Sequence, residues 1–417
     1  MGSISGISGL DRTPEELESI VNRMGGTLRH RGNKKYCYFS SNSDFGGVST
    51  FTRGCEASNS GFFPKNEISP QILFEGFITI NGTTLVGGES VANLLLESYR
   101  ESGLRFLEVA DGSFALALWD ETEKKMILAR DRVGSKPLFY WHETGRIVFS
   151  SEIKGILASE VIEKKVDWAS LNYFLSYGYI PNPFTLFKGI KQVRPGHLIV
   201  FKDGKLEEHE YWKFTYRTNG ISIPEIELVE SFKALFTRAV SDRMELDPYI
   251  GAFLSGGLDT SCVAAVMRQV KGKPFKVFTA GFEEKAYNEL GDAQIVARHL
   301  DLDHHHVMVH FDDTFPELLE KIVWHHDAPF ADTSAIPSYY AAKLARGHVD
   351  TVLTGDFPDQ LIGGSGHQVL ALARLDGDPL AKRAFRALNV QRYIAKLNWK
   401  TEGAEFLDRA KRFLYRE

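Results

Sequence analysis

The chain has 417 residues, which is long enough for two domains with separate cores. Its hydrophobic content of 43% and charged content of 25% are ordinary for a globular protein, and its formal net charge of −5 gives no electrostatic basis for nucleic-acid binding. The sequence shows no apolar run of membrane-helix length, no secretory signal and no paired cysteine spacing. We therefore expect a cytoplasmic protein with reduced thiols and neither a nucleic-acid nor a membrane partner.

The first half of the chain, residues 1–205, has the pattern of short strands separated by turns. Alternating or apolar runs indicate strands, and turn signals such as Asp111-Gly112 and Asp203-Gly204 separate them. This pattern predicts an α+β domain with layered antiparallel sheets. Strands are expected at 36–40, 72–80, 113–119, 125–129, 146–150 and 197–201, and helices at 14–24, 90–102 and 167–177.

A polar, irregular segment at 206–225 is assigned to a linker. Strand-like and helical runs then alternate over 226–417, which predicts βαβ units and a parallel sheet whose ligands bind at the carboxyl ends of its strands. Strands are expected at 250–254, 276–280, 305–309 and 351–354, and helices at 229–243, 260–269, 290–299, 315–324 and 336–346.

The stretch from Ser255 to Ser261 joins a predicted strand to a predicted helix through Gly256 and Gly257. Such a turn presents backbone N–H groups to an anion at a helix N-terminus. Ser255, Thr260 and Ser261 add hydroxyl groups, and Asp259 can hold a divalent metal. No Gly-Lys-Ser/Thr follows, so this is not a Walker loop. It has the form of the pyrophosphate loop of enzymes that split ATP into AMP and pyrophosphate; the alternatives are a plain turn and, for Asp259, a helix-capping carboxylate.

Ordered motifs along the chain resemble those of the asparagine synthetase family. They cover nearly its whole length, and their number makes a chance match negligible. The motifs are Asp111 to Asp120, Asp131-Arg132-Val133-Gly134-Ser135-Lys136-Pro137-Leu138, Ser151-Glu152-Ile153-Lys154, Arg194-Pro195-Gly196-His197, the glycine loop, Gly281-Phe282, Pro329 to Asp332, Ser334 to Pro337, and Thr354-Gly355-Asp356-Phe357-Pro358-Asp359.

The resemblance implies a fold and a division of labour. The first domain, 1–205, would be a class II glutamine amidotransferase of the N-terminal-nucleophile type. The second, 226–417, would be an adenine nucleotide α-hydrolase-like ATP pyrophosphatase. In the family, that second domain activates a carboxylate as an acyl-adenylate, which ammonia or another amine attacks.

Carried over motif by motif, the resemblance implies ATP and Mg²⁺ sites in the second domain. Asp259 and Asp359 would hold Mg²⁺, for which carboxylate and phosphate oxygens are suitable ligands. Asp359 has the alternative of ordinary turn chemistry. Asp356 would face the activated carboxylate. The ATP-binding residues would be Leu254, Ser255, Gly256, Gly257, Asp259, Thr260, Ser261, Phe278, Gly281, Thr354 and Gly355.

The first domain departs from the family pattern at its nucleophile. Active members begin Met-Cys-Gly-Ile, so that removal of Met leaves a cysteine whose own α-amino group serves as base. Here Gly2 stands at that position and has no side chain to attack with. Met1-Gly2-Ser3 is also compatible with an expression-tag remnant.

The glutamine-binding residues differ as well. Arg31 keeps its place in a His-Arg-Gly motif, but Glu75 and Phe77 stand where the family has Asn and Glu. Asp111 is retained. We expect an inactive glutaminase that a Gly2→Cys substitution does not restore, as in β-lactam synthetases and lasso-peptide cyclases.

The synthetase turn also differs from the family. Phe357-Pro358 is bulkier and more rigid than usual, and Asp359-Gln360 replaces an Asp-Glu pair, which indicates an altered acceptor pocket. Aspartate or a related acid remains open as the substrate. The family's Asp-Arg-Met-Ser-Met-Ala-type motif is missing from 363–417, so we expect an acceptor site that is incomplete or completed by a partner; the resemblance also makes a homodimer plausible.

Two histidine clusters invite a metal interpretation. Adjacent residues on a strand point to opposite faces, so at most two of His304, His305 and His306 could converge on a metal. We therefore expect this triplet to lie at a strand edge. We expect a structural role for His325-His326-Asp327.

The sequence as a whole predicts an AMP-forming amide ligase without its own glutaminase. The alternative is a catalytically dead ATP-binding homologue that acts as a scaffold or regulator.

Overall fold

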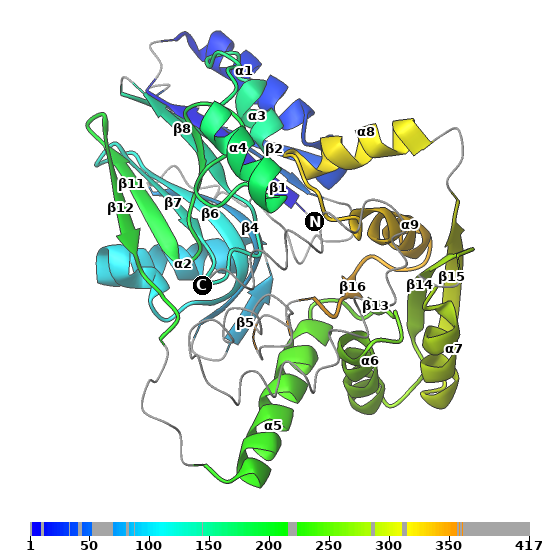
Figure 1. The fold of residues 1–417 in the computed structure, drawn as a ribbon. Helices are drawn as coiled ribbons and strands as arrows, with labels where there is room; N and C mark the ends of the chain where they lie inside the picture. Colours follow the sequence, from blue (N-terminus) through cyan, green and yellow to red (C-terminus); the bar gives the residue numbers. More distant parts are fainter. Residues whose placement is uncertain are drawn as a thin grey trace, which may run out of the picture. The chain divides into compact units, whose positions relative to one another are not determined.

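The computed structural model describes residues 2–9, 12–32, 34–40, 44–51, 70–80, 83–86, 88–143, 145–215, 223–284, 288–310, 315–356, 358 and 361 (Figure 1). The chain divides into two compact units. One comprises Met1–Ile250, Ala280–Asn288 and His306–Asp350, and the other Gly251–Thr279, Glu289–His305 and Thr351–Glu417. Among the described residues, no helix combines the length and apolar character that a membrane span requires.

Two six-stranded sheets dominate the first half of the chain, and every strand pair within them is antiparallel. The first sheet has the order β10-β8-β9-β1-β3-β2 and consists of β1 (Gly2–Ser8), β2 (Lys34–Phe39), β3 (Phe45–Phe51), β8 (Phe139–Glu143), β9 (Arg146–Ser150) and β10 (Ile190–Gln192). The second has the order β12-β11-β7-β6-β4-β5 and consists of β4 (Gln71–Ile80), β5 (Thr83–Val86), β6 (Asp111–Asp120), β7 (Lys125–Arg130), β11 (His197–Lys202) and β12 (Lys205–Glu210).

The two sheets and the helices on their outer faces form four layers, with buried side chains between them. Ile4 and Phe45 of the first sheet pack against Ala117 and Leu128 of the second, which forms the central core. Helix α2 (Gly88–Ser102) packs on the outer face of the second sheet through residues such as Leu95 (Figure 1). Helices α1 (Pro14–Gly26) and α3 (Ile153–Leu157) pack on the outer face of the first. The short helices η1 (Arg29–Arg31), η2 (Gly103–Leu107) and α4 (Trp168–Tyr177) complete this part.

Local signals explain where α1 begins. Thr13 and Glu16 form a capping box, in which the Thr13 hydroxyl accepts from the Glu16 N–H and the Glu16 carboxylate accepts from the Thr13 N–H. Pro14 occupies the first turn, where its missing N–H costs nothing. The helix then buries Leu17, Val21 and Met24 against the first sheet.

The later part of the chain alternates strands with helices. A four-stranded sheet has the order β15-β14-β13-β16, and β13 pairs in parallel with both β14 and β16. The elements are α5 (Glu225–Met244), β13 (Gly251–Phe253), α6 (Leu258–Lys271), β14 (Lys276–Phe282), α7 (Leu290–His299), β15 (Asp303–Val309), α8 (Phe315–His326), α9 (Ala335–Ala345) and β16 (Val352–Leu353).

This architecture confirms the predicted fold class of layered antiparallel sheets followed by a parallel sheet. All the expected strands and helices are present, and the helix expected at 290–299 has those limits. Strands β1, β3, β5, β8 and β10 lie outside the predicted set, and β12 extends over residues 206–210 of the segment that the sequence assigns to the linker.

Candidate functional site

The glycine loop lies between the end of β13 and the start of α6. Leu254 is held there by two hydrogen bonds: its N–H donates to the Phe278 carbonyl at 3.0 Å, and its carbonyl accepts from the Thr279 hydroxyl at 2.5 Å. The loop therefore starts from a fixed strand end. Gly257 is the N-cap residue of α6 and provides no side-chain cap, so the first turn of the helix begins with an exposed backbone.

Hydroxyl groups close the loop internally. The Ser255 N–H donates to the Thr260 hydroxyl at 3.2 Å, the two hydroxyls lie 3.0 Å apart, and the Gly257 N–H donates to the Ser255 hydroxyl at 3.2 Å. These contacts fold the backbone back over the helix N-terminus. Ser255 and Thr260 thus shape the loop in the described structure, a role that the sequence pattern alone does not distinguish from direct phosphate binding.

Gly256 has a backbone conformation and surroundings that only glycine fits. Its φ is +85°, and a Cβ atom there would lie 2.6 Å from the Ala293 nitrogen and 2.7 Å from the Asp292 carbonyl carbon. The loop is therefore packed directly against the first turn of α7. Side chains from that turn, including Asp292, are brought to the loop, although no sequence motif singles them out.

The turn after β16 adjoins the same helix N-terminus. Because β13 and β16 are parallel neighbours, with Gly251 paired to Val352, their carboxyl ends lie at one edge of the sheet. A Cβ atom on Gly355 would lie 2.7 Å from the Thr260 nitrogen. The structure thus brings together the glycine loop and the Thr354-Gly355-Asp356 turn, as the sequence predicts from their positions after strands. Thr354 and Asp356 are exposed there.

Two features of this edge fit a bound polyphosphate. The Ser261 hydroxyl is buried in the first turn of α6 and has no hydrogen-bond partner among the described residues. Asp259, in the same turn, is half-buried. The backbone N–H groups and the hydroxyl suit an anion, and the carboxylate suits a hard cation. Asp359, the second predicted Mg²⁺ ligand, lies outside the described residues, and within the described part no group of three or more candidate ligands gathers.

Three of the residues predicted to bind ATP, Leu254, Phe278 and Gly281, are buried. Leu254 is 1% exposed and Phe278 is 0% exposed, and the Phe278 ring stacks on His305 with centroids 5.6 Å apart. The backbone of Phe278 lies beside the start of the loop, because its carbonyl accepts the hydrogen bond from Leu254. Gly281 is buried farther along β14.

The histidine triplet lies on β15, the last strand of its sheet, which confirms the strand-edge interpretation. The His304 ring nitrogen is 2.8 Å from the Thr279 hydroxyl, and the His305 ring is 3.1 Å from Asp303. His304 therefore supports the Thr279–Leu254 contact that fixes the end of β13. Its role in the described structure is positional.

Around Gly2 the first unit contains a buried ionic cluster. Arg31 donates from Nε to the Gly2 carbonyl at 2.9 Å, from Nη1 to Glu152 at 3.0 Å and from Nη2 to Glu75 at 2.6 Å. Burial favours the neutral form, but the charges of Glu75 and Glu152 raise the pKa of Arg31 above its ordinary value. All three nitrogens of the guanidinium thus donate to groups of the chain itself.

Glu152 extends the cluster toward α8. Burial would raise the pKa of Glu152, but hydrogen bonds from His30 and Lys154, together with the charge of Arg31, lower it to about 2. Lys154 also pairs with Asp327 at 3.1 Å, and its backbone N–H donates to the same carboxylate at 2.9 Å. Asp327 has a φ of +62° at the end of α8. These contacts support the structural interpretation of His325-His326-Asp327.

The other two residues of the predicted glutamine site lie on β4 and β6. The Phe77 ring lies 5.9 Å from the guanidinium carbon of Arg243 in α5. Asp111 accepts a hydrogen bond from the Gly112 N–H at 2.7 Å, and its side chain is 66% exposed, with Arg132 3.6 Å away. Asp111 therefore remains accessible, whereas Arg31 and Glu75 are bound to each other.

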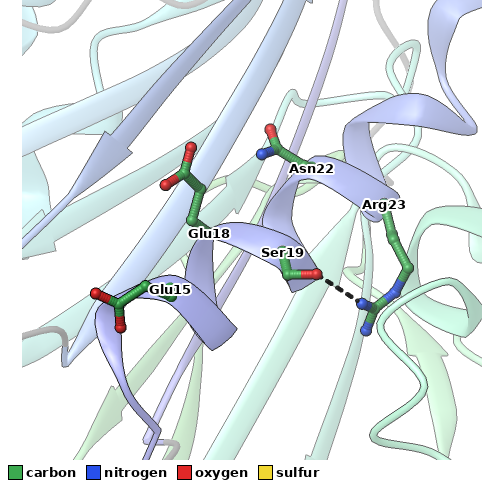
Figure 2. A pocket seen from close by; sticks show the side chains of 5 residues that line it. All are labelled: Glu15, Glu18, Ser19, Asn22 and Arg23. Carbon is green, nitrogen blue, oxygen red and sulfur yellow. Dashed lines mark hydrogen bonds between the residues drawn. The ribbon is translucent and has the colours of Figure 1, made fainter.

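A surface hollow of about 510 Å³ lies along α1 and contains none of these residues. Figure 2 shows its lining, in which Arg23 donates to the Ser19 hydroxyl at 3.1 Å. All five lining residues, Glu15, Glu18, Ser19, Asn22 and Arg23, come from one helix, and they describe a solvated polar face rather than a site with converging groups.

Sequence reasoning missed the carboxylates at the start of α7. Partial burial, followed by the charge of Asp292, raises the pKa of Glu289. Their position next to the glycine loop follows from the packing of Gly256 against the first turn of α7. The sequence signal that could have found them is their place at a helix N-terminus after strand β14, at the same edge of the sheet as the glycine loop.

The chain thus combines layered antiparallel sheets with a parallel sheet that carries a glycine loop at its edge. The family model "Asparagine synthase" matches residues 231–417, and "Glutamine amidotransferase domain" matches residues 81–212. The chain belongs to the asparagine synthetase family.

Individual relatives agree. The chain is 34% identical over 274 residues to "Putative asparagine synthetase [glutamine-hydrolyzing] 2" of Methanocaldococcus jannaschii, covering 65% of this chain and 53% of that protein. It is 31% identical over 277 residues to "Asparagine synthetase [glutamine-hydrolyzing] 1" of Bacillus subtilis, covering 66% of this chain and 43% of that protein. The chain thus spans about half the length of these curated relatives.

Among solved structures, the glutamine phosphoribosylpyrophosphate amidotransferase of B. subtilis is similar at a TM-score of 0.34 and 12% identity, covering 76% of this chain and 70% of that chain. The fold is defined by the strand pairing rather than by this weak likeness.

Proposed function

We propose that this protein is an ATP-dependent, AMP-forming amide ligase that activates a carboxylate as an acyl-adenylate. Ammonia or an amine carried by a substrate would then attack it. Aspartate or a related acid is the candidate carboxylate. The observation that carries the proposal is the convergence, at one edge of the parallel sheet, of the glycine loop, the Gly355 turn and the Ser261 hydroxyl, which has no partner among the described residues.

Each group at this edge has a proposed task. The chemistry that ATP and Mg²⁺ would supply is activation of the carboxylate with release of pyrophosphate. The N–H groups at the start of α6 and the Ser261 hydroxyl would bind the phosphates. Asp259 and Asp359 would hold Mg²⁺. Asp356, exposed beside the loop, would orient the carboxylate. The end of β13 at Leu254 would border the adenine base.

We infer further that the first domain has no glutaminase activity. Gly2 offers no nucleophile, and the guanidinium of Arg31 is already bound to Glu75, Glu152 and the Gly2 carbonyl. Ammonia or a substrate amine would therefore reach the ligase site without glutamine hydrolysis at this domain. We also propose that the protein is cytoplasmic. It would act as a homodimer or with a partner that completes the acceptor site.

The test is ATP–pyrophosphate exchange with Mg²⁺, using aspartate and a panel of other carboxylates. We expect exchange with one acid or a few, and a loss of at least about 100-fold in Asp259→Ala, because the metal neutralises charge that develops in the transition state. The matched control is Asp242→Ala, which removes a half-exposed helical aspartate from α5 and should leave exchange unchanged. Asp242 lies in the other compact unit from the glycine loop.

The outcomes separate the ligase from its alternative. Exchange that depends on a particular acid and on Asp259 supports the ligase. ATP binding measured by calorimetry, without exchange for any acid, would point to a scaffold or regulator that binds nucleotide. Glutamine-dependent ammonia release by the unmodified protein would contradict the inference about the first domain.

A further inference from the structure

Glu75 is a buried carboxylate with an unusually complete set of partners. Its side chain is 1% exposed. Oxygen Oε1 accepts from Arg31 at 2.6 Å and lies 3.7 Å from the Lys136 ammonium, and oxygen Oε2 accepts from the Ser151 hydroxyl at 2.7 Å. A guanidinium, an ammonium and a hydroxyl that converge on one carboxylate are the groups with which proteins bind free carboxylate ligands.

Two of these partners, Ser151 and Arg31, are held in place independently of Glu75. The Ser151 hydroxyl accepts from the Ile4 N–H at 2.9 Å, and the Ser151 N–H donates to the Ile4 carbonyl at 2.8 Å. Arg31 is anchored by the Gly2 carbonyl and by Glu152. The receiving groups are therefore preorganised by β1 and Glu152, which is what a binding site requires.

The cationic side of this cluster reaches solvent, whereas the carboxylate does not. The side chains of Arg31 and Lys136 are 14% and 23% exposed, against 1% for Glu75. An anion that entered past these two cations would thus meet the position that the Glu75 carboxylate already occupies.

We propose that Arg31, Lys136 and Ser151 form a carboxylate-binding site that Glu75 occupies as a tethered ligand. In the unmodified protein the site is closed to free carboxylates. Once the side chain of Glu75 is removed, it accepts a small monocarboxylate. This inference concerns the first-domain cluster alone and does not depend on ligase activity.

Glu75→Ala tests the inference because the group that it removes, one methylene and one carboxylate, corresponds to acetate. We expect the melting temperature to fall by roughly 10 °C, since two partly buried cations lose a partner. Acetate should restore most of that loss in a saturable titration. Acetamide, which has the same shape without the charge, and sodium chloride at equal ionic strength should restore little.

Controls separate a binding site from an ordinary ion pair. The unmodified protein should show no saturable response to acetate. Neither should Glu160→Ala, which removes the carboxylate from an exposed pair with Arg23 at 3.5 Å. The double variant Arg31→Ala with Glu75→Ala should lose the acetate response, because the principal donor is gone.

Equal stabilisation of Glu75→Ala by acetate and by acetamide would overturn the inference, as would an acetate response that survives in the double variant. If Glu75→Ala is recovered unfolded, refolding in acetate should yield folded protein and refolding in acetamide should not. Failure to fold in both would equally overturn it.

Discussion

Replacing Gly256 by alanine tests whether the glycine loop depends on its contact with α7. The new Cβ would lie 2.6 Å from the Ala293 nitrogen and 2.7 Å from the Asp292 carbonyl carbon, both backbone atoms. That is about 1 Å short of an ordinary contact, so the loop or the first turn of α7 must move. The α7 N-terminus is the end of a regular helix and cannot yield as a side chain would.

The expected loss in the free energy of unfolding of Gly256→Ala has two parts. A φ of +85° costs a non-glycine residue about 1–2 kcal/mol, and overpacking against backbone adds about 1–3 kcal/mol. We therefore expect Gly256→Ala to lower the free energy of unfolding by about 2–5 kcal/mol. Displacement of the loop N–H groups should also weaken ATP binding by at least about tenfold, since about 1.4 kcal/mol is a tenfold change.

Gly272→Ala is the matched control. Gly272 ends α6 with a φ of +66°, and nothing lies within 4 Å of its Cβ position. It should lose only the backbone part, about 1–2 kcal/mol, and bind ATP normally. Urea unfolding gives the free energies and calorimetry gives the affinities. Equal losses of stability in the two variants, or normal ATP binding by Gly256→Ala, would refute the packing argument.

Three further outcomes are expected. Ser261→Ala should change stability by less than about 0.5 kcal/mol, because its hydroxyl has no described partner, yet raise the KM for ATP in the exchange assay severalfold. Glu152 has a pKa lowered from 4.5 to about 2, so the stability it contributes is present above pH 4.5 and lost as the pH falls toward 2. That contribution is about 3 kcal/mol, and Glu152→Gln should flatten the acid limb of urea-unfolding free energy against pH; an unchanged limb would contradict the assignment. Gly2→Cys should gain no glutaminase activity in an ammonia-release assay, since Arg31 stays bound to Glu75, and release above background would contradict this.

The sequence was most informative where local patterns decide the structure. The helix expected at 290–299 and the strand expected at 146–150 have those limits because their apolar periodicity and turn signals are local. The glycine loop and the Gly355 turn were placed correctly at strand ends, since parallel sheets collect such turns at one edge.

Strand β1 could not be predicted in the same way. Its sequence is rich in glycine and serine, whereas strand signals rest on β-branched and aromatic residues. The small residues are required by a distant partner: a Cβ on Gly6 would lie 2.7 Å from the Phe149 ring. Tertiary packing, rather than propensity, makes this segment a strand between β3 and β9.

The charge cluster around Arg31 was hidden for a related reason. The sequence identified Glu75 as a departure from the family, but its pairing with Arg31 spans 44 positions and its bond from Ser151 spans 76. No periodicity or motif encodes such contacts. The replacement therefore looked like a loss from a site, whereas the structure also reveals a new ion pair.

The pairing of Gly251 with Val352 has a consequence for how the chain is made. The two residues are about 100 positions apart, and a ribosome that adds roughly 5–20 residues per second would need about 5–20 s to travel between them. Throughout that interval the edge of β13 that will receive β16 has no native partner. An unpaired strand edge is a template for pairing with other chains. Slower synthesis over this stretch would therefore lengthen the period in which nascent chains can aggregate, without altering a single contact of the finished fold.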